Sequence, residues 1–153
     1  MSGRTDRASR TIRASPAVLY RAFEDPGAMA SWLPPAGMTG HMERFDFREG
    51  GSYRMRLTYD DGRGSGKSTA DADDVEVRIV GLVRDRRIEQ AVTFDSDDPR
   101  FAGVMRLTWT FEPAPAGTRV TVVADGVPEG ISAEDHAAGL ASTLENLAKF
   151  AEG

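Results

Sequence analysis

The chain has 153 residues, 40% of them hydrophobic and 28% charged, with a formal net charge of -5 at pH 7. A chain of this length can bury about two-thirds of its unfolded surface in one core, so we expect a single domain over residues 1–153. Because it has no cysteine and only 2 histidines, neither a thiolate nor a histidine-rich metal site can form, and no metal or cofactor is expected.

The charge pattern also limits the expected partners and location. Most cations are arginines scattered along an acidic chain without a basic run, so nucleic acid is not an expected partner. No stretch is apolar enough to span a membrane, and the polar segment Met1–Asp6 does not resemble a signal peptide. We therefore expect a cytoplasmic protein without a membrane span.

The first expected elements are a short strand and two short helices. Residues 1–8 are expected to form a disordered tail, and residues 11–15 a strand. Ser15-Pro16 is a typical helix start, and an apolar stripe continues that helix to residue 23. One more helical turn is expected over residues 28–32.

From residue 41 onward, apolar and polar side chains alternate, which is typical of strands with one buried face. The pair Gly50-Gly51 predicts the turn of a first hairpin, because glycine tolerates positive φ. Residues 60–66 are expected to be a flexible connection. Two further hairpins are predicted over residues 75–94 and 104–124, so the strands form an antiparallel meander.

The last expected element is a long amphipathic helix. Ser132 can cap its start, with Asp135 in place of the glutamate of a capping box. Leu140, Leu144 and Leu147 then repeat at helical spacing. A sheet with one apolar face and one such helix can bury both if the sheet curls around the helix.

Several segments resemble the START-like (SRPBCC, helix-grip) superfamily, and most closely its branch named after the activator of the ninety-kilodalton heat-shock protein's ATPase. The segments are Ser15-Pro-Ala-Val-Leu-Tyr-Arg-Ala-Phe23, Trp32-Leu-Pro-Pro35, Arg48-Glu-Gly-Gly-Ser-Tyr53, Val80-Gly-Leu-Val-Arg-Asp-Arg-Arg-Ile88 and Gly117-Thr-Arg-Val-Thr-Val122. The resemblance runs from about Thr11 to the C-terminus.

This resemblance implies an α+β helix-grip fold. Its curved antiparallel sheet, of about six or seven strands, wraps around the long C-terminal helix, and two short helices follow the first strand. It also implies a cavity between sheet and helix, which relatives use for lipids, hormones, sterols or polyketides. Where relatives often carry Gly-Trp in the last helix, this chain has Gly139-Leu140, which puts a smaller side chain against the expected pocket.

The candidate ligand site collects large, flexible or polar-tipped side chains on faces expected to point inward. The set is Trp32, His41, Glu43, Phe45, Tyr53, Met55, Met105, Trp109, His136 and Leu140. A few polar groups among aromatic and methionine side chains are typical of a pocket that orients an apolar molecule. No catalytic residue is assigned, because the sequence contains no nucleophile elbow.

Simpler interpretations stand beside these assignments. Trp32 is either a plug of the core or a wall of the pocket, and less readily a lid. His41 and Glu43 could form an acid-base pair near a ligand. A histidine beside a glutamate at the end of a strand is more commonly a solvated pair. His136, in the first turn of the last helix, is more often an exposed residue than a catalyst.

Three functions remain open. The first is binding of a small hydrophobic molecule (a lipid, polyketide or aromatic metabolite) by a monomer or weak homodimer. The second is a co-chaperone-like module that acts on a heat-shock protein ATPase. Its contact surface would lie on the solvent-facing side of the strands and consist of Arg54, Arg56, Arg78, Arg106 and Arg119. The third is a cyclase or isomerase that uses His41, Glu43 or Tyr53 in the same cavity.

Overall fold

A computed structural model describes residues 4–60 and 72–152 of the chain. Within these residues, one antiparallel sheet has the strand order β1-β7-β6-β5-β4-β3-β2. In chain order the elements are β1 (Thr5–Ile12), α1 (Pro16–Arg21), α2 (Pro26–Trp32), β2 (Met38–Phe45), β3 (Ser52–Tyr59), β4 (Ala72–Val83), β5 (Arg87–Phe94), the 3-10 helix η1 (Pro99–Phe101), β6 (Met105–Ala114), β7 (Gly117–Asp125) and α3 (Ala133–Glu152).

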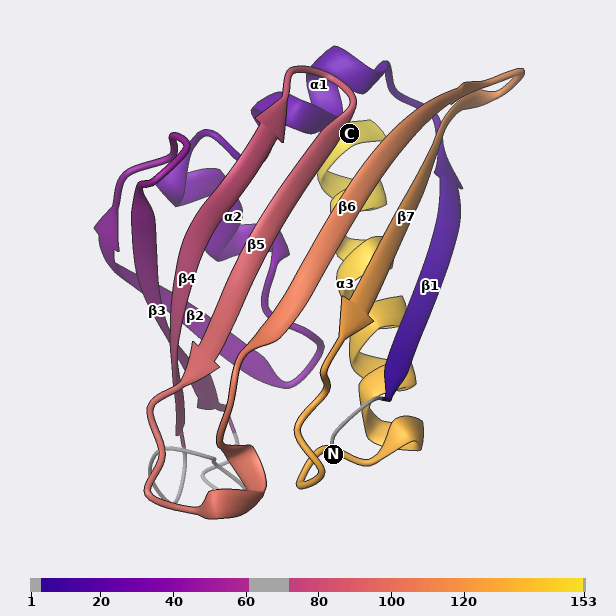
Figure 1. The fold of residues 1–153 in the computed structure, drawn as a ribbon. Helices are drawn as coiled ribbons and strands as arrows, with labels where there is room; N and C mark the ends of the chain where they lie inside the picture. The colour runs from indigo at the N-terminus through magenta and orange to yellow at the C-terminus, as the bar shows by residue number, and fades with distance from the viewer. Residues whose placement is uncertain (1–3, 61–71, 153) are drawn as a thin grey trace.

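The sheet curves around α3, as the expected helix-grip α+β fold requires. Figure 1 shows the twisted sheet in front and α3 behind it, on the side of β6, β7 and β1, with α1 and α2 also behind the sheet. The strand pairs β2–β3, β4–β5 and β6–β7 confirm the three predicted hairpins. No helix in the described part of the chain is long and apolar enough to cross a membrane.

Local signals in the sequence define the starts of α1 and α3 and the first turn of the sheet. The Ser15 hydroxyl accepts a hydrogen bond from the backbone of Val18 at 3.2 Å, and the Ser132 hydroxyl accepts one from Asp135 at 3.0 Å. In the turn between β2 and β3, Gly50 has a φ of +82°, as the glycine pair predicted. The connection expected over residues 60–66 lies outside the described residues from 61 on.

The first strand differs from the prediction. Residues 5–12 pair with β7, from Thr5 opposite Asp125 to Ile12 opposite Thr118. The disordered tail is therefore wrong at residues 5–8, and the strand expected over residues 11–15 is present only at residues 11–12. The reason is that β1 is an edge strand in which only Ile12 is fully buried, so its sequence has almost no apolar period.

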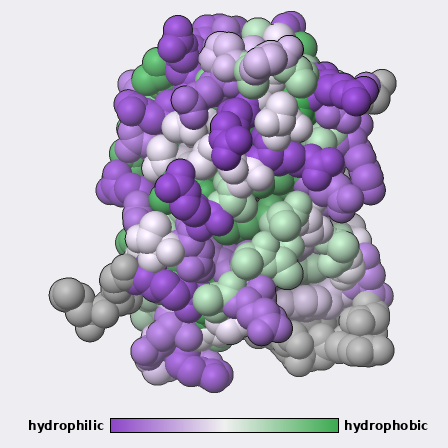
Figure 2. All heavy atoms as spheres, turned by 90° about the vertical axis from the view of Figure 1, so that its right-hand side faces the viewer, coloured by the Kyte–Doolittle hydropathy of each residue, from purple (hydrophilic) through white to green (hydrophobic). Residues whose placement is uncertain are grey.

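Polar side chains cover the outward positions of this edge. Arg7 and Ser9 are exposed on the outward face of β1, and Arg10 is exposed on the other face; charged edges of this kind disfavour pairing with a second sheet. Figure 2, which views the molecule from the side of β1, shows hydrophilic side chains over most of this face, with hydrophobic ones mainly around its middle and lower part.

The core is packed densely beside the C-terminal half of α3. The ring of Phe23 lies 4.8 Å from Trp32, 5.0 Å from Trp109 and 5.7 Å from Phe111, each in an edge-to-face arrangement. Leu144 and Leu147 of α3 are buried in the same cluster. The sheet and α3 therefore meet closely at this end, and any space between them lies toward the start of α3.

Candidate ligand-binding site

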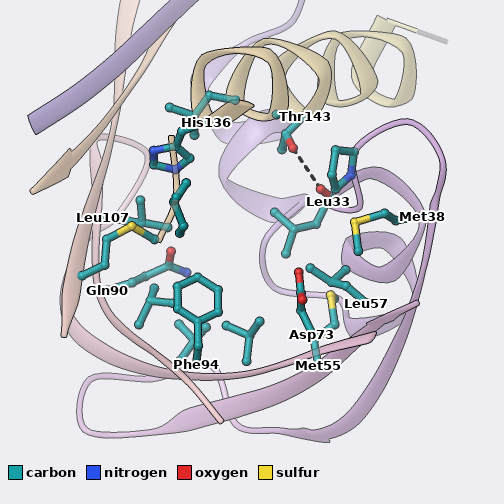
Figure 3. A pocket seen from close by; sticks show the side chains of 18 of the residues that line it. Leu33, Met38, Met55, Leu57, Asp73, Gln90, Phe94, Leu107, His136 and Thr143 are labelled. Atoms are coloured by element: carbon teal, nitrogen blue, oxygen red, sulfur yellow. Dashed lines mark hydrogen bonds between the residues drawn. The ribbon is translucent and has the colours of Figure 1, made fainter. Parts of the chain in front are cut away.

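A cavity of about 500 Å³ lies between the inner face of the sheet and the first half of α3. Figure 3 shows α3 on one side, with His136 and Thr143 pointing into the space, and Met55, Leu57 and Phe94 pointing toward it from the strands opposite. Most of the lining is apolar, which is typical of ligand pockets. The expected inward arrangement of the apolar strand faces is thus present, and the interior is not packed solid.

Small residues of α3 keep this space open. Gly139 belongs to the lining, and a Cβ added at this position would meet no atom within 4 Å. Its neighbour Leu140 also lines the cavity. A larger side chain at position 140 would take up part of the volume. The departure at Gly139-Leu140 therefore bears directly on the size of the pocket.

The structure brings six of the predicted site residues together around the cavity. Two come from β3, two from β6 and two from α3: Tyr53, Met55, Met105, Trp109, His136 and Leu140. Alternation along β3 and β6 places the first four on the same inner face, because side chains two apart on a strand point the same way.

Trp32 is a core residue and is not part of the cavity wall. Its indole is 1% exposed, and Nε1 donates a hydrogen bond to the backbone oxygen of Ala22 at 2.9 Å. The indole packs against Phe23 and lies 6.1 Å from Trp109. Of the interpretations given above, the structure therefore places Trp32 as a plug of the core.

The inward placement of His41 and Glu43 is wrong, because β2 contains a bulge. His41 pairs with Arg56 and Met42 with Met55, after which the register shifts so that Arg44 pairs with Arg54. Glu43 is the extra residue. Cross-strand partners share a face, so Met42 follows Met55 inward while His41 lies on the outer face and is exposed.

The remaining positions on β2 follow from the same bulge. The Glu43 carboxylate lies 3.2 Å from the guanidinium of Arg54, outside the cavity, so the acid-base pair His41–Glu43 is not assembled in the pocket. Phe45 does point inward, but it packs on Phe47 and Tyr53 beside the core, with ring centroids 6.3 and 5.7 Å apart, and does not line the cavity.

The predicted site set missed five residues of the lining with polar groups, namely Tyr59, Asp73, Gln90, Asp135 and Thr143. Gln90 occupies the inward position between Ile88 and Val92 on β5, and a lone polar residue in an apolar period was the signal that could have identified it. The Thr143 hydroxyl donates a hydrogen bond to the backbone oxygen of Leu33 at 3.0 Å and joins α3 to the end of α2 (Figure 3).

Three buried side chains form a continuous chain of hydrogen bonds. Nε1 of Trp109 donates to Oε1 of Gln90 at 3.1 Å, and Nε2 of Gln90 lies 3.3 Å from the Tyr53 hydroxyl. Tyr53 and Gln90 are each 2% exposed. Burial raises the pKa of Tyr53 well above its ordinary value, so the hydroxyl keeps its proton at neutral pH.

His136 lies at the junction of α3 and β1. Its Nδ1 is 2.7 Å from a carboxylate oxygen of Asp6, which also accepts hydrogen bonds from Arg4. Burial alone would raise the pKa of Asp6, but the hydrogen bonds from His136 and Arg4 outweigh it and hold that pKa below its ordinary value. The His136 side chain is only 12% exposed, so its interpretation as an exposed helix residue is wrong.

The curved sheet, the long last helix and the cavity between them define a helix-grip protein of the START-like class. The family model described as "Activator of Hsp90 ATPase homolog 1-like protein" matches residues 13–152, and the chain belongs to this family. The resemblance found in the sequence is thereby confirmed.

Solved structures agree with this assignment. A crystal structure of a protein from Chromobacterium violaceum is 32% identical, covers 97% of each chain and has a TM-score of 0.86. A solution structure from Arthrobacter aurescens shares the fold at 16% identity, with a TM-score of 0.79 over 97% of this chain and 86% of its own. A structure of a protein from Rhizobium leguminosarum, at a resolution of 1.9 Å, shares the fold at 22% identity, with a TM-score of 0.74 over 98% of this chain and 95% of its own. No curated protein matches the sequence.

Proposed function

We propose that the protein binds one small, mostly hydrophobic molecule in the cavity between the sheet and α3. The observation that carries this proposal is the cavity itself, whose volume of about 500 Å³ falls within the range of ligand sites, about 300 to 1,000 Å³. Four methionines, Met29, Met38, Met55 and Met105, line it together with aromatic side chains. Methionine adapts its shape to irregular apolar ligands.

Energetics argue against an empty cavity of this size. At about 24 cal/mol per Å³, a dry void of about 500 Å³ would cost about 12 kcal/mol. The whole stability of a domain is only about 5 to 15 kcal/mol. Water or a ligand must therefore fill the space, and a mostly apolar wall favours a ligand over water because water there finds few polar partners.

The two other functions have less support from the geometry. Carboxylates lie beside three of the arginines proposed as a chaperone-contact surface: Asp95 is 2.7 Å from Arg54, Asp74 is 2.8 Å from Arg56, and Glu89 is 3.7 Å from Arg106. These arginines are therefore already paired within the protein, and the proposed action on a heat-shock protein is supported by the family's description alone. Of the three groups considered for an isomerase, only Tyr53 lines the cavity, because His41 and Glu43 lie outside it.

Methionine methyl groups provide the test. We would label them with ¹³C and titrate the protein with fatty acids, sterols and aromatic polyketides. We expect a binding compound to shift the signals of Met55 and Met105, while Met42, which is outside the cavity lining, stays unchanged. If no compound moves the cavity signals but the protein captures a heat-shock protein and alters its ATPase rate, the binding proposal is wrong.

A further inference from the structure

The hydrogen-bond chain from Trp109 to Tyr53 has only one possible direction. An indole N–H donates and cannot accept, so the amide atom of Gln90 that faces it at 3.1 Å must be the oxygen. The amide nitrogen then faces the Tyr53 hydroxyl at 3.3 Å. Because the NH₂ group only donates, the Tyr53 oxygen must accept. The orientation of the glutamine amide is fixed by the network and needs no further assumption.

This direction leaves the proton of the Tyr53 hydroxyl available. A hydroxyl both donates and accepts, and here its acceptor side is used by Gln90. Among residues 4–60 and 72–152, the hydroxyl takes part in the hydrogen bond from Gln90 and donates none to a protein acceptor. Tyr53 is 2% exposed and lines the cavity, so bulk water reaches it poorly. A buried donor without an acceptor is unfavourable, and a molecule in the cavity can supply one.

On the basis of the binding function proposed above, we propose that the ligand is a neutral, largely apolar carbonyl compound whose oxygen accepts a hydrogen bond from the Tyr53 hydroxyl. Tyr53 then selects among apolar molecules of similar shape. A site built to donate a hydrogen bond discriminates against the analogue that lacks the acceptor, because the donor is left unpaired.

A neutral oxygen fits better than a carboxylate. The lining includes Asp73 and Asp135, whereas no lysine or arginine belongs to it among the described residues. Figure 3 shows the Asp73 carboxylate pointing toward the same space. An anionic group placed beside Tyr53 would lose its hydration against an apolar wall without gaining a lysine or arginine partner from the described lining. Ketones, esters and quinones avoid that cost.

A pair of probes of nearly equal shape tests the proposal. Benzophenone carries a carbonyl oxygen where 1,1-diphenylethylene carries a CH₂ group, so the two differ in little except the acceptor. We would measure the dissociation constants of both for the whole protein from the ¹³C-methyl signals of Met55 and Met105. We expect benzophenone to bind about 3- to 10-fold more tightly, which is the worth of one net hydrogen bond.

Tyr53→Phe removes the hydroxyl. It should weaken the binding of benzophenone but not that of 1,1-diphenylethylene, so the preference for benzophenone should disappear. Tyr20→Phe is the matched control, because Tyr20 is an equally buried tyrosine outside the cavity lining, and its variant should keep the preference. Infrared spectroscopy of benzophenone bound to the unaltered protein gives a readout that needs no variant. Its C=O stretch should lie at lower wavenumber than in hexane, as in a hydrogen-bonded ketone.

The outcomes separate the two proposals. If both probes bind equally, or if the carbonyl stretch matches that in hexane, the carbonyl inference is wrong while the binding function stands. If neither probe nor any molecule of the wider panel shifts the methionine signals, both are wrong. If Tyr53→Phe does not fold, the preference and the carbonyl stretch of the unaltered protein still decide. A carboxylic acid of similar size binding more tightly than benzophenone would also overturn the inference.

Discussion

Nδ1 of His136, in the first turn of α3, lies 2.7 Å from a carboxylate oxygen of Asp6 on the edge strand β1. The two residues are 130 positions apart in the chain, and their contact joins the last element to the first at the end of α3 that borders the cavity. Arg4 completes the group with hydrogen bonds to the same carboxylate.

This contact predicts a loss of stability in acid. Because the folded-state pKa of Asp6 is lowered, its ionised form stabilises the fold above the unfolded pKa of about 3.9, and that contribution is lost as pH falls through the folded value. We expect Asp6→Asn to cost about 1 to 2 kcal/mol at pH 7, in urea unfolding, through loss of charge-assisted hydrogen bonds. At pH 3 the difference between variant and parent should shrink, and an equal difference at both pH values would contradict this.

Replacing Gln90 should destabilise the fold, because one buried donor and one buried acceptor lose their hydrogen-bond partner at the same time. Gln90→Met keeps a similar volume but leaves the indole N–H of Trp109 and the Tyr53 oxygen unpaired. We expect a loss of about 1 to 3 kcal/mol in the free energy of unfolding. Glu145→Gln, at an exposed position of α3, serves as the control and should stay within about 0.5 kcal/mol of the parent. A Gln90→Met protein as stable as this control would show that the hydrogen-bond chain does not contribute to the stability of the fold.

Replacing Gly139 or Gly130 by alanine should change the stability of the protein in opposite directions. Gly139→Ala meets no atom within 4 Å and removes a flexible residue from a helix, so we expect a gain of about 0.5 to 1 kcal/mol. At Gly130 the new Cβ would lie 2.7 Å from the Phe101 ring and 2.9 Å from the Arg100 backbone oxygen, so Gly130→Ala should be destabilising. Thermal unfolding measures both, and a destabilised Gly139→Ala would mean that α3 packs more tightly there.

Trp32→Phe distinguishes a core plug from a lid. The change removes the hydrogen bond to the Ala22 backbone oxygen and part of the packing on Phe23, so we expect a loss of about 2 to 3 kcal/mol in the free energy of unfolding. Ligand-induced shifts of Met55 and Met105 should be retained at temperatures where the variant is folded. A variant of unchanged stability that no longer binds would instead assign a lid role to the indole.

Much of the architecture could be predicted from local patterns. The alternation along β3 and β6 identified Tyr53, Met55, Met105 and Trp109 as inward residues, because a strand has a fixed side-chain period of two. Ser132 identified the start of α3, because its hydroxyl caps the first turn. These features depend on residues close together in the chain.

Other features could not be predicted this way. The bulge at Glu43 arises only where β2 pairs with β3, and one extra residue there reversed the expected direction of His41. The strand β1 forms because it pairs with the edge of β7, since its own sequence shows little alternation of apolar and polar residues. In both cases a distant partner decides the local conformation.

Periodicity and capping, which are local properties of the chain, predicted the strands, the long last helix and six residues of the cavity wall, while the resemblance of several segments implied the helix-grip fold and the family. The position of Gln90 between Trp109 and Tyr53, and the contact of His136 with Asp6, could be seen only in the folded molecule. Hydrogen bonds between such distant residues depend on which donors and acceptors face one another, and that is fixed only when the strands pair and the sheet and helix pack together.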